Sequence, residues 1–571
     1  MQRSCGVPRL VPVSTRSGFH DNAADSTMQI ATLVLQLLLA VAFSGLLVRI
    51  LHVPAPFVQI ALGVALAWPA VAGIHVTLEP GLFLLLFVPP LLFLDGLSAP
   101  KREFRQLWFP IAALAFGLVF FTIWVIGYAL HWLIPSLPLP VAFALAAILS
   151  PTDAVAVGSI VDRTQLPPRL MHVLEGEALL NDASGLVVFR LAIAAAMSGQ
   201  FVLAQTLGPF VLVAVGGALA GVATLLAIAQ AQRLIAKLGD IPSEAQVLVA
   251  LLLPFGAYLL AEHFHASGIL AAVTAGLLFR WSGMYRHTGL EASIQSSVLW
   301  GTLAFAFNGV IFLLLGLQLP DIIRKVPAAI SGRHAILEPL TWIIVLTLAL
   351  IALRFVWSLI NHTTRHQIAW WRGKVYDFPG FLVSLALAFA GVRGAITLAG
   401  VLSIPLLLPN GAPFPGRDLC IFLAAGVIIC SLLMASIALP LITRRMTLPA
   451  DDPREAETRE ARVASATAAI ALIEQQVAAR NGTGSGATHA DVGARMIAGY
   501  RLRIAAAQTG NEQSEEARAA YNAERELRLA AIAAERDALR KLFNARKIND
   551  ETSGELMREL ALAEATLRLS E

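Results

Sequence analysis

The sequence predicts an all-α polytopic membrane protein that ends in a helical tail, and two observations carry this prediction. Hydrophobic residues make up 57% of the 571 residues and charged residues only 14%, whereas soluble domains hold about 25% charged residues. The charges are also uneven, because residues 451–571 hold 17 basic and 20 acidic residues, against 25 and 18 in the first 450. We therefore expect a membrane region followed by an aqueous one.

About thirteen apolar segments can serve as membrane-spanning helices, since a bilayer core of about 30 Å needs about 20 helical residues. They are residues 30–50, 54–73, 81–99, 107–130, 139–160, 171–197, 207–229, 244–264, 267–283, 295–318, 339–361, 379–404 and 418–442. The predicted organisation is a leader over 1–29, a transmembrane domain over 30–445 and a helical tail over 446–571.

Basic residues in the connecting loops predict the orientation. Fifteen Lys and Arg residues lie in alternate loops that start after the first span, and the opposite loops hold four. The N-terminus is therefore predicted outside and the tail in the cytoplasm. The leader breaks this pattern and lacks the apolar core of a signal peptide. Because Met28 precedes the first span, we expect the leader to be disordered or a start-site artefact.

Ionisable residues inside the apolar spans are candidate functional groups, because each is costly there unless it is paired or faces water. They are Asp95, Asp153, Glu175, Glu177, Asp182, Arg190, Arg354, Arg393 and, near a span end, Glu262. For Arg190 and Arg354, a buried ion pair that holds helices in register remains an equal alternative. Asp95 is expected to cap or orient a short loop, with direct involvement in transport as the alternative.

Two of the spans contain helix-breaking residues. Pro151 interrupts the fifth span, which leaves backbone carbonyls and Thr152 free to coordinate an ion, with Asp153 in the break. Two glycines flank Arg393 in the twelfth span. Since these spans are seven apart, we expect two inverted six-helix repeats joined by span 7. Paired broken helices indicate a midplane binding site in a secondary transporter.

The sixth span places polar groups along one helix edge. Helical spacing puts Glu177 beside Asn181 and Ala178 beside Asp182. Asp182 thus faces a methyl group that leaves room for an ion. Because burial disfavours a charged carboxylate, such a group can hold either a proton or a hard cation, and this competition is sufficient for exchange.

Five segments together resemble the monovalent cation:proton antiporter family, in its sodium/proton exchanger branch. They are Phe93–Leu97, Pro151–Val157, Glu177–Asp182, Gly309–Leu319 and Gly391–Ala395. The resemblance covers about residues 30–445. It implies a dimerisation domain of spans 1–3 and 8–10, a mobile ion-carrying domain of spans 4–6 and 11–13, and broken helices that cross.

The resemblance also implies roles for individual residues. Asp182 would carry the ion and the proton, with Asp153 and Thr152 as its neighbours. Glu177 would be the partner of Arg393.

Two further positions bear on stoichiometry and ligation. Asn181 implies electroneutral exchange, since it offers no second proton site beside Asp182. Ala178 departs from the family, in which many members carry a serine that helps to coordinate the cation, and Ser184 or water is the candidate substitute. Arg354 is kept as a supporting residue.

The expected function is exchange of cytoplasmic Na⁺, with Li⁺ as a second candidate, for external H⁺ by a homodimer in a bacterial inner membrane. It would serve pH and sodium homeostasis. A K⁺/H⁺ or broad alkali-cation exchanger remains the alternative. No HExxH or GxSxG motif of a hydrolase occurs, and the short basic clusters between apolar runs do not suit nucleic acid. No cofactor is expected.

Overall fold

The computed structural model describes residues 18–68, 80–161, 166–199, 203–239, 241–282, 290–329, 337–371, 380–446, 453–480, 486–507 and 512–569. The chain divides into two compact units, Met1–Leu448 and Pro449–Glu571. The described residues are predominantly helical, as the sequence predicts, and their β-pairing is limited to an isolated bridge between Leu407 and Pro413.

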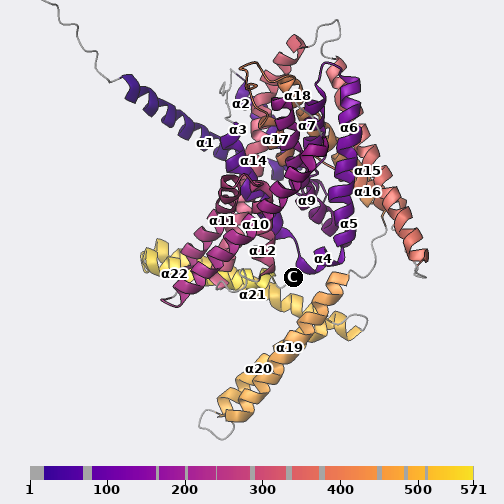
Figure 1. The fold of residues 1–571 in the computed structure, drawn as a ribbon. Coiled ribbons are helices and arrows are strands. Elements are labelled where there is room, and N and C mark those ends of the chain that lie inside the picture. The colour runs from indigo at the N-terminus through magenta and orange to yellow at the C-terminus, as the bar shows by residue number, and fades with distance from the viewer. Residues whose placement is uncertain are drawn as a thin grey trace, which may run out of the picture. The chain divides into compact units, whose positions relative to one another are not determined.

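The first unit is a bundle of apolar helices (Figure 1). Its first half contains α1 (Gly18–Leu51), α2 (Ala55–Ala67), α3 (Pro80–Ser98), α4 (Lys101–Gln106), α5 (Trp108–Ala112), the π-helical segment η1 (Ala113–Leu118), α6 (Val119–Leu133), α7 (Leu139–Leu149), α8 (Ala154–Ile160) and α9 (Pro168–Ser198). Its second half contains α10 (Leu203–Ala236), α11 (Ser243–His263), α12 (Gly268–Trp281), α14 (Leu290–Ala329), α15 (Leu337–Trp371), α16 (Phe381–Phe389), α17 (Ala395–Leu402) and α18 (Arg417–Thr443).

The thirteen expected spans all coincide with helical segments. Among the described residues, eight helices are long and apolar enough to cross a membrane, and the bent pair α7/α8 makes a ninth. The other expected spans coincide with the shorter helices α2, α3 and α12 and with the pair α16/α17. Helix α1 begins at Gly18, inside the expected leader, whose residues 1–17 lie outside the described residues.

The helices of the first unit pack as two groups. Group I contains α1–α3, α10–α12 and α14, and its tightest pairs are α2 with α14 and α3 with α12. Group II contains α5–α9, η1 and α15–α18, in which α7 packs against α6 and α9. Apart from α10, the groups contain the helices of the two domains that the resemblance implies.

A π-helical turn widens the helix at η1, in the fourth span. Such turns leave carbonyls that a neighbouring side chain can bind. The indole N–H of Trp357, on α15, donates to the carbonyl of Ala113 at 3.1 Å, and the Ser184 hydroxyl, on α9, donates to that of Ala115 at 2.9 Å. The irregular turn therefore joins α15 and α9 within group II.

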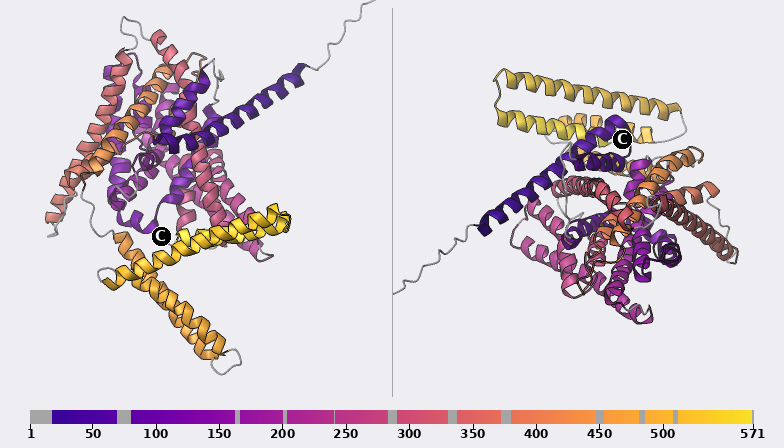
Figure 2. Two further views of the ribbon diagram at one scale, coloured as in Figure 1. Left: turned by 180° about the vertical axis from the view of Figure 1, so that it is seen from behind. Right: turned by 90° about the horizontal axis from the view of Figure 1, so that it is seen from above.

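The second unit contains α19 (Pro453–Arg480), α20 (Gly486–Ala507), α21 (Glu512–Asn544) and α22 (Asp550–Leu569). Helix α19 packs along α20, and α21 lies beside α22 (Figure 2). An ion pair between Arg536 and Glu564 joins α21 to α22.

Candidate ion-binding site

The two broken helices meet at their breaks. Helices α7 and α8 are bent by 49° across residues 150–153, and five residues, 390–394, separate α16 from α17. The Asp153 N–H donates to the Val392 carbonyl at 2.8 Å, so one break supplies a donor and the other an acceptor. A Cβ at Gly394 would overlap the Asp153 carboxylate. Glycine is needed there because the Asp153 side chain lies directly against the Gly394 backbone.

The Asp153 carboxylate lies between the N-terminal ends of two half-helices. One of its oxygens accepts from the N–H groups of Val155 at 2.8 Å and Ala156 at 3.0 Å, at the start of α8. The carboxylate also interacts with the N–H of Ala395, at the start of α17. Helix N-termini carry unpaired N–H groups and a partial positive charge. A negative charge is therefore stabilised at this crossing without a basic side chain.

Arg393 provides the complementary charge at the C-terminal ends of the half-helices. Its Nε donates to the carbonyl of Leu149, the last residue of α7, at 2.9 Å. Its guanidinium also donates to the carbonyl of Gly391, just beyond α16. Helix C-termini present unpaired carbonyls and a partial negative charge. Arg393 thus binds the ends of both broken helices.

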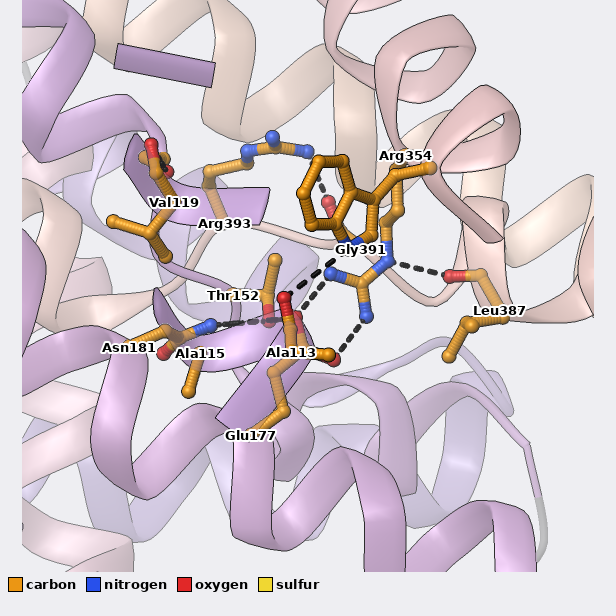
Figure 3. A network of polar contacts seen from close by, with 12 residues as sticks. Ala113, Ala115, Val119, Thr152, Glu177, Asn181, Arg354, Leu387, Gly391 and Arg393 are labelled. Carbon is orange, nitrogen blue, oxygen red and sulfur yellow. Dashed lines mark hydrogen bonds and ion pairs between the residues drawn. The ribbon is translucent and has the colours of Figure 1, made fainter. Parts of the chain in front are cut away.

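The expected pairing of Glu177 with Arg393 is wrong, because Arg354 of α15 occupies that position (Figure 3). The guanidinium of Arg354 binds both carboxylate oxygens of Glu177, one of them at 2.6 Å, and its Nε donates to the Leu387 carbonyl at 2.7 Å. Glu177 is 0% and Arg354 2% exposed. Arg354 was predicted to be either a functional group or a member of a buried ion pair, and the structure shows the buried ion pair.

Two polar side chains are tied to this ion pair. The Thr152 hydroxyl donates to Glu177 at 3.3 Å, and the Asn181 amide donates to the Thr152 hydroxyl at 3.0 Å. The amide is also 3.5 Å from the same Glu177 oxygen. Thr152 and Asn181 therefore connect the break of α7/α8 to α9.

Asp182 faces a different environment from Glu177. It is 5% exposed and lines a cavity of about 80 Å³, several times the space that one water molecule needs. The cavity is lined by Leu91, Leu94, Asp95, Ser98, Thr152, Asp153, Ala154, Val155, Met171, Glu175, Ala178, Asp182, Asn308, Gly394, Ala395, Ile396 and Thr397. Among the described residues, Asp182 has no ion pair, and the charged groups that act on it are acidic: Asp95, Asp153 and Glu177.

The cavity also contains polar groups beyond Asp182, Asp153 and Thr152, the residues expected to bind the ion. Glu175 stands seven residues, or two helical turns, before Asp182, and both line the cavity; this spacing is visible in the sequence. Asp95, expected to cap or orient a loop, lines the cavity as well. Asn308, on α14, gives no sequence signal, because only the packing of group I against group II brings it here.

The hydroxyl that the family supplies at position 178 is not replaced by Ser184. The Ser184 hydroxyl donates to the backbone carbonyls of Ala115 and Asn181, at 2.9 and 3.0 Å. Ser184 is also absent from the residues that line the cavity, whereas the alternative of water stays a prediction. Hydroxyl-bearing residues that do line the cavity are Ser98, Thr152 and Thr397.

A family model described as the transmembrane sodium/hydrogen exchanger matches residues 37–445, most of the chain and nearly all of the first unit. The chain belongs to the sodium/hydrogen exchanger family. Members of this family are membrane-embedded cation/proton antiporters rather than enzymes, as the sequence predicts.

Curated relatives resemble the chain over almost its whole length. An uncharacterized Na⁺/H⁺ exchanger of Escherichia coli (strain K12), YjcE, is 41% identical over 95% of this chain and 99% of its own. A sodium, potassium, lithium and rubidium/H⁺ antiporter of Bacillus subtilis (strain 168) is 38% identical over 93% of this chain and 77% of its own.

Among solved structures, the sodium proton antiporter MjNhaP1 from Methanocaldococcus jannaschii matches with a TM-score of 0.53. The alignment covers 73% of the present chain and 99% of the MjNhaP1 chain, at 17% sequence identity. At this identity the likeness concerns the fold.

Proposed function

We propose that this chain is a secondary active antiporter that exchanges cytoplasmic Na⁺ for external H⁺ at Asp182. The observation that carries the proposal is a buried carboxylate that faces a cavity at the helix crossing and has no basic partner among the described residues. A charge in such a place is costly unless a counter-ion neutralises it. Either a proton or a cation can do so.

Competition for Asp182 couples the two fluxes. A proton on the carboxyl removes its charge, and a bound Na⁺ balances it, whereas the bare carboxylate remains uncompensated beside Asp95 and Asp153. We assume that group II moves the site between the two sides of the membrane only when Asp182 is neutralised. Each Na⁺ that moves in one direction is then exchanged for one H⁺ that moves in the other. Movement of group II against group I would supply the alternating access.

The ligands that we propose for the cation are oxygen atoms at the helix crossing. Asp182 and Asp153 supply carboxylates, and Thr152 supplies oxygen from the break in α7/α8. Hard cations prefer such ligands. The Asp153 carboxylate has about four lone-pair directions, so N–H bonds to α8 leave others for an ion. Thr397 supplies the hydroxyl that Ala178 lacks.

Exchange would be electroneutral. Asn181, beside the carrier, is neutral, and its amide is bound to Thr152 and Glu177. Asp153 is held between helix N-termini that stabilise its negative charge. Asp182 is then the group that changes its occupant during the cycle.

A second candidate is a broader alkali-cation/proton exchanger. The 38% identical Bacillus relatives are named sodium, potassium, lithium and rubidium/H⁺ antiporters. The lack of a hydroxyl at Ala178 leaves the cavity wider and less specific for a small ion.

The setting that we propose is a homodimer in a bacterial inner membrane, with the N-terminus outside and the tail in the cytoplasm. The basic loops support this orientation. The role would be pH and sodium homeostasis.

The test uses proteoliposomes that contain the purified full-length protein and an acidic interior. Addition of Na⁺ should raise the internal pH, Asp182→Asn should abolish this change, and an imposed membrane potential should leave the rate unchanged. Li⁺, K⁺ and Rb⁺ in place of Na⁺ decide between the two candidates. Na⁺-dependent proton movement in Asp182→Asn would refute the assignment.

A further inference from the structure

Arg190 of α9 connects the two helix groups through its guanidinium. Its Nη1 lies 2.5 Å from the Glu262 carboxylate, and its Nη2 donates to the Tyr258 hydroxyl at 2.8 Å. Both partners belong to α11. The guanidinium also lies 5.9 Å from the centre of the Tyr258 ring. One side chain of group II therefore makes three polar contacts with one helix of group I.

These contacts stand out because α9 and α11 otherwise make little contact. Helix α9 packs chiefly on α7, η1 and α5, whereas α11 packs on α12, α10 and α3. Tyr258 is fixed within group I, because its ring lies against Gly268, where a Cβ would overlap it. The bridge thus adds a side-chain attachment to α11 beside the contacts that α9 makes with α3, α10 and α12 of group I.

The bridge and the cavity lie on opposite sides of Asp182 along α9. The cavity runs from Asp182 toward Glu175 and Met171, near the start of α9. Arg190 is eight residues beyond Asp182, which is about 12 Å along a helix. Glu262 is one residue from the end of α11.

The basic loops identify the two sides. Lys101, Arg102 and Arg105 of α4 follow the end of α3 that lines the cavity, and α4 contacts α9. This loop is on the side predicted to be cytoplasmic. The cavity therefore extends toward the cytoplasmic side, and the bridge lies toward the external side.

We propose that Arg190, Tyr258 and Glu262 form an external closure that holds group II against group I while the cavity is open to the cytoplasm, and that it breaks in each transport cycle. This inference rests on the proposed exchange. The three are positioning residues, because they act on the position of α9 and do not touch the ion.

The exposure of the bridge suits contacts that form and break. The side chains of Arg190 and Glu262 are 34% and 38% exposed, so the protein does not enclose this ion pair. The Glu177–Arg354 pair, in contrast, is buried inside group II and cannot open so easily.

The test compares apparent Na⁺ affinity from the two sides of the membrane, in inside-out and right-side-out vesicles. Arg190→Gln and Glu262→Gln should favour the outward-open state. We expect affinity to rise about threefold to tenfold from outside and to fall from the cytoplasmic side. Tyr258→Phe should give a smaller shift of the same sign, and the exchanged pair Arg190→Glu with Glu262→Arg should restore the wild-type ratio.

The matched control is Arg417→Gln. Arg417 starts α18 in group II, and its Nε donates to the Ile404 carbonyl within that group. It lies on the same predicted face, so its loss should leave the ratio of the two affinities unchanged. Equal changes on both sides in Arg190→Gln would indicate general damage and overturn the closure. Absence of exchange in the wild type would instead overturn the proposed function.

A cross-link gives an independent readout. Cysteines at positions 190 and 262, in a protein whose Cys5, Cys420 and Cys430 are replaced, can be joined by a cleavable bifunctional thiol reagent. The linked protein should not exchange, and reduction should restore exchange to the unlinked level. Exchange at the unlinked rate while the link is intact would overturn the proposal.

Discussion

Glu177 and Asp182 stand five residues apart on the same helix, and both are buried, yet their surroundings differ in kind. Glu177 is enclosed by Arg354, Thr152 and Asn181, so every part of its charge is met by the protein. Asp182 faces a cavity and acidic neighbours. Burial therefore does not by itself identify a transport carboxylate. Under the proposed function, Asp182, which has no ion pair among the described residues, would be the carboxylate that binds the transported ion.

Asp153 represents a third arrangement. Its charge is met by backbone N–H groups at the starts of α8 and α17. This carboxylate also lines the cavity, so it can face a bound ion. Under the proposed function, the three carboxylates would serve as an ion-pair partner, a backbone-bound ligand and a carrier.

The largest expected effect on folding separates Glu177 from Asp182. Glu177→Gln leaves Arg354 buried without its partner, which costs about 3–5 kcal/mol, so we expect a large loss of folded protein in a thermal unfolding assay by size-exclusion chromatography. Asp182→Asn removes an unpaired charge and should unfold at or above the wild-type temperature. Similar unfolding temperatures for Glu177→Gln and the wild type would show that the ion pair with Arg354 does not distinguish Glu177 from Asp182.

The position of the Asp153 carboxylate can be changed without altering its chemistry. Gly394→Ala places a methyl group against the Asp153 carboxylate. We expect a loss of about 1–3 kcal/mol of stability and slower exchange, because the carboxylate must move away from α17. Gly301→Ala, at a helical glycine with open space around it, is the control. Full exchange by Gly394→Ala would show that the position of Asp153 does not matter.

The ligands available beside Asp182 can be changed by substitution of Ala178. Ala178→Ser adds a hydroxyl to the wall of the cavity beside Asp182. One added polar ligand contributes about 0.5–1.5 kcal/mol, so apparent Na⁺ affinity should rise roughly twofold to tenfold in the vesicle assay. Thr397→Val should lower it by a similar factor. An unchanged affinity in both variants would remove the hydroxyls from the proposed ligand set.

The smallest expected effect concerns Glu564, a carboxylate on α22 of the second unit. Hydrogen bonds from Arg536 and Arg568 hold the pKa of the half-buried Glu564 carboxyl below its usual value. Because the pKa is lowered on folding, this stabilisation is present above the unfolded value of about 4.3 and is lost as the pH falls through the folded value.

The measurement is hydrogen-exchange protection of α22 in the full-length protein. Protection should stay level from neutral pH down to about 4.3 and decrease modestly below it, and Glu564→Gln should have the low-pH level already at neutral pH. Equal protection in both proteins at neutral pH would show that the bonds to Glu564 contribute nothing.

Local rules predict much of the fold. Apolar length locates the thirteen spans, and Pro151 and the glycines around Arg393 locate both breaks, because these residues prevent regular helices wherever they lie. Helical spacing also brings Asp182 and Ala178 to one edge. The π-helical turn at η1 has no comparable signal, since its carbonyls are satisfied by Ser184 and Trp357 from other helices.

Pairing between distant side chains is what the sequence does not determine. Two buried arginines were available to Glu177, and only the packing of α15 against α16 and α18 decides for Arg354. Arg393 instead satisfies the carbonyl ends of the broken helices. For the same reason, the role of Ser184 depended on a carbonyl 69 residues away.

The most direct test of the division between carrier and ion-pair partner is the number of protons released when Na⁺ binds to the purified protein in a weakly buffered solution at a pH where Asp182 is protonated. The account predicts release of up to one proton per Na⁺ bound in the wild type and in Gly301→Ala, and none in Asp182→Asn. Na⁺-dependent proton release that persists in Asp182→Asn would contradict it.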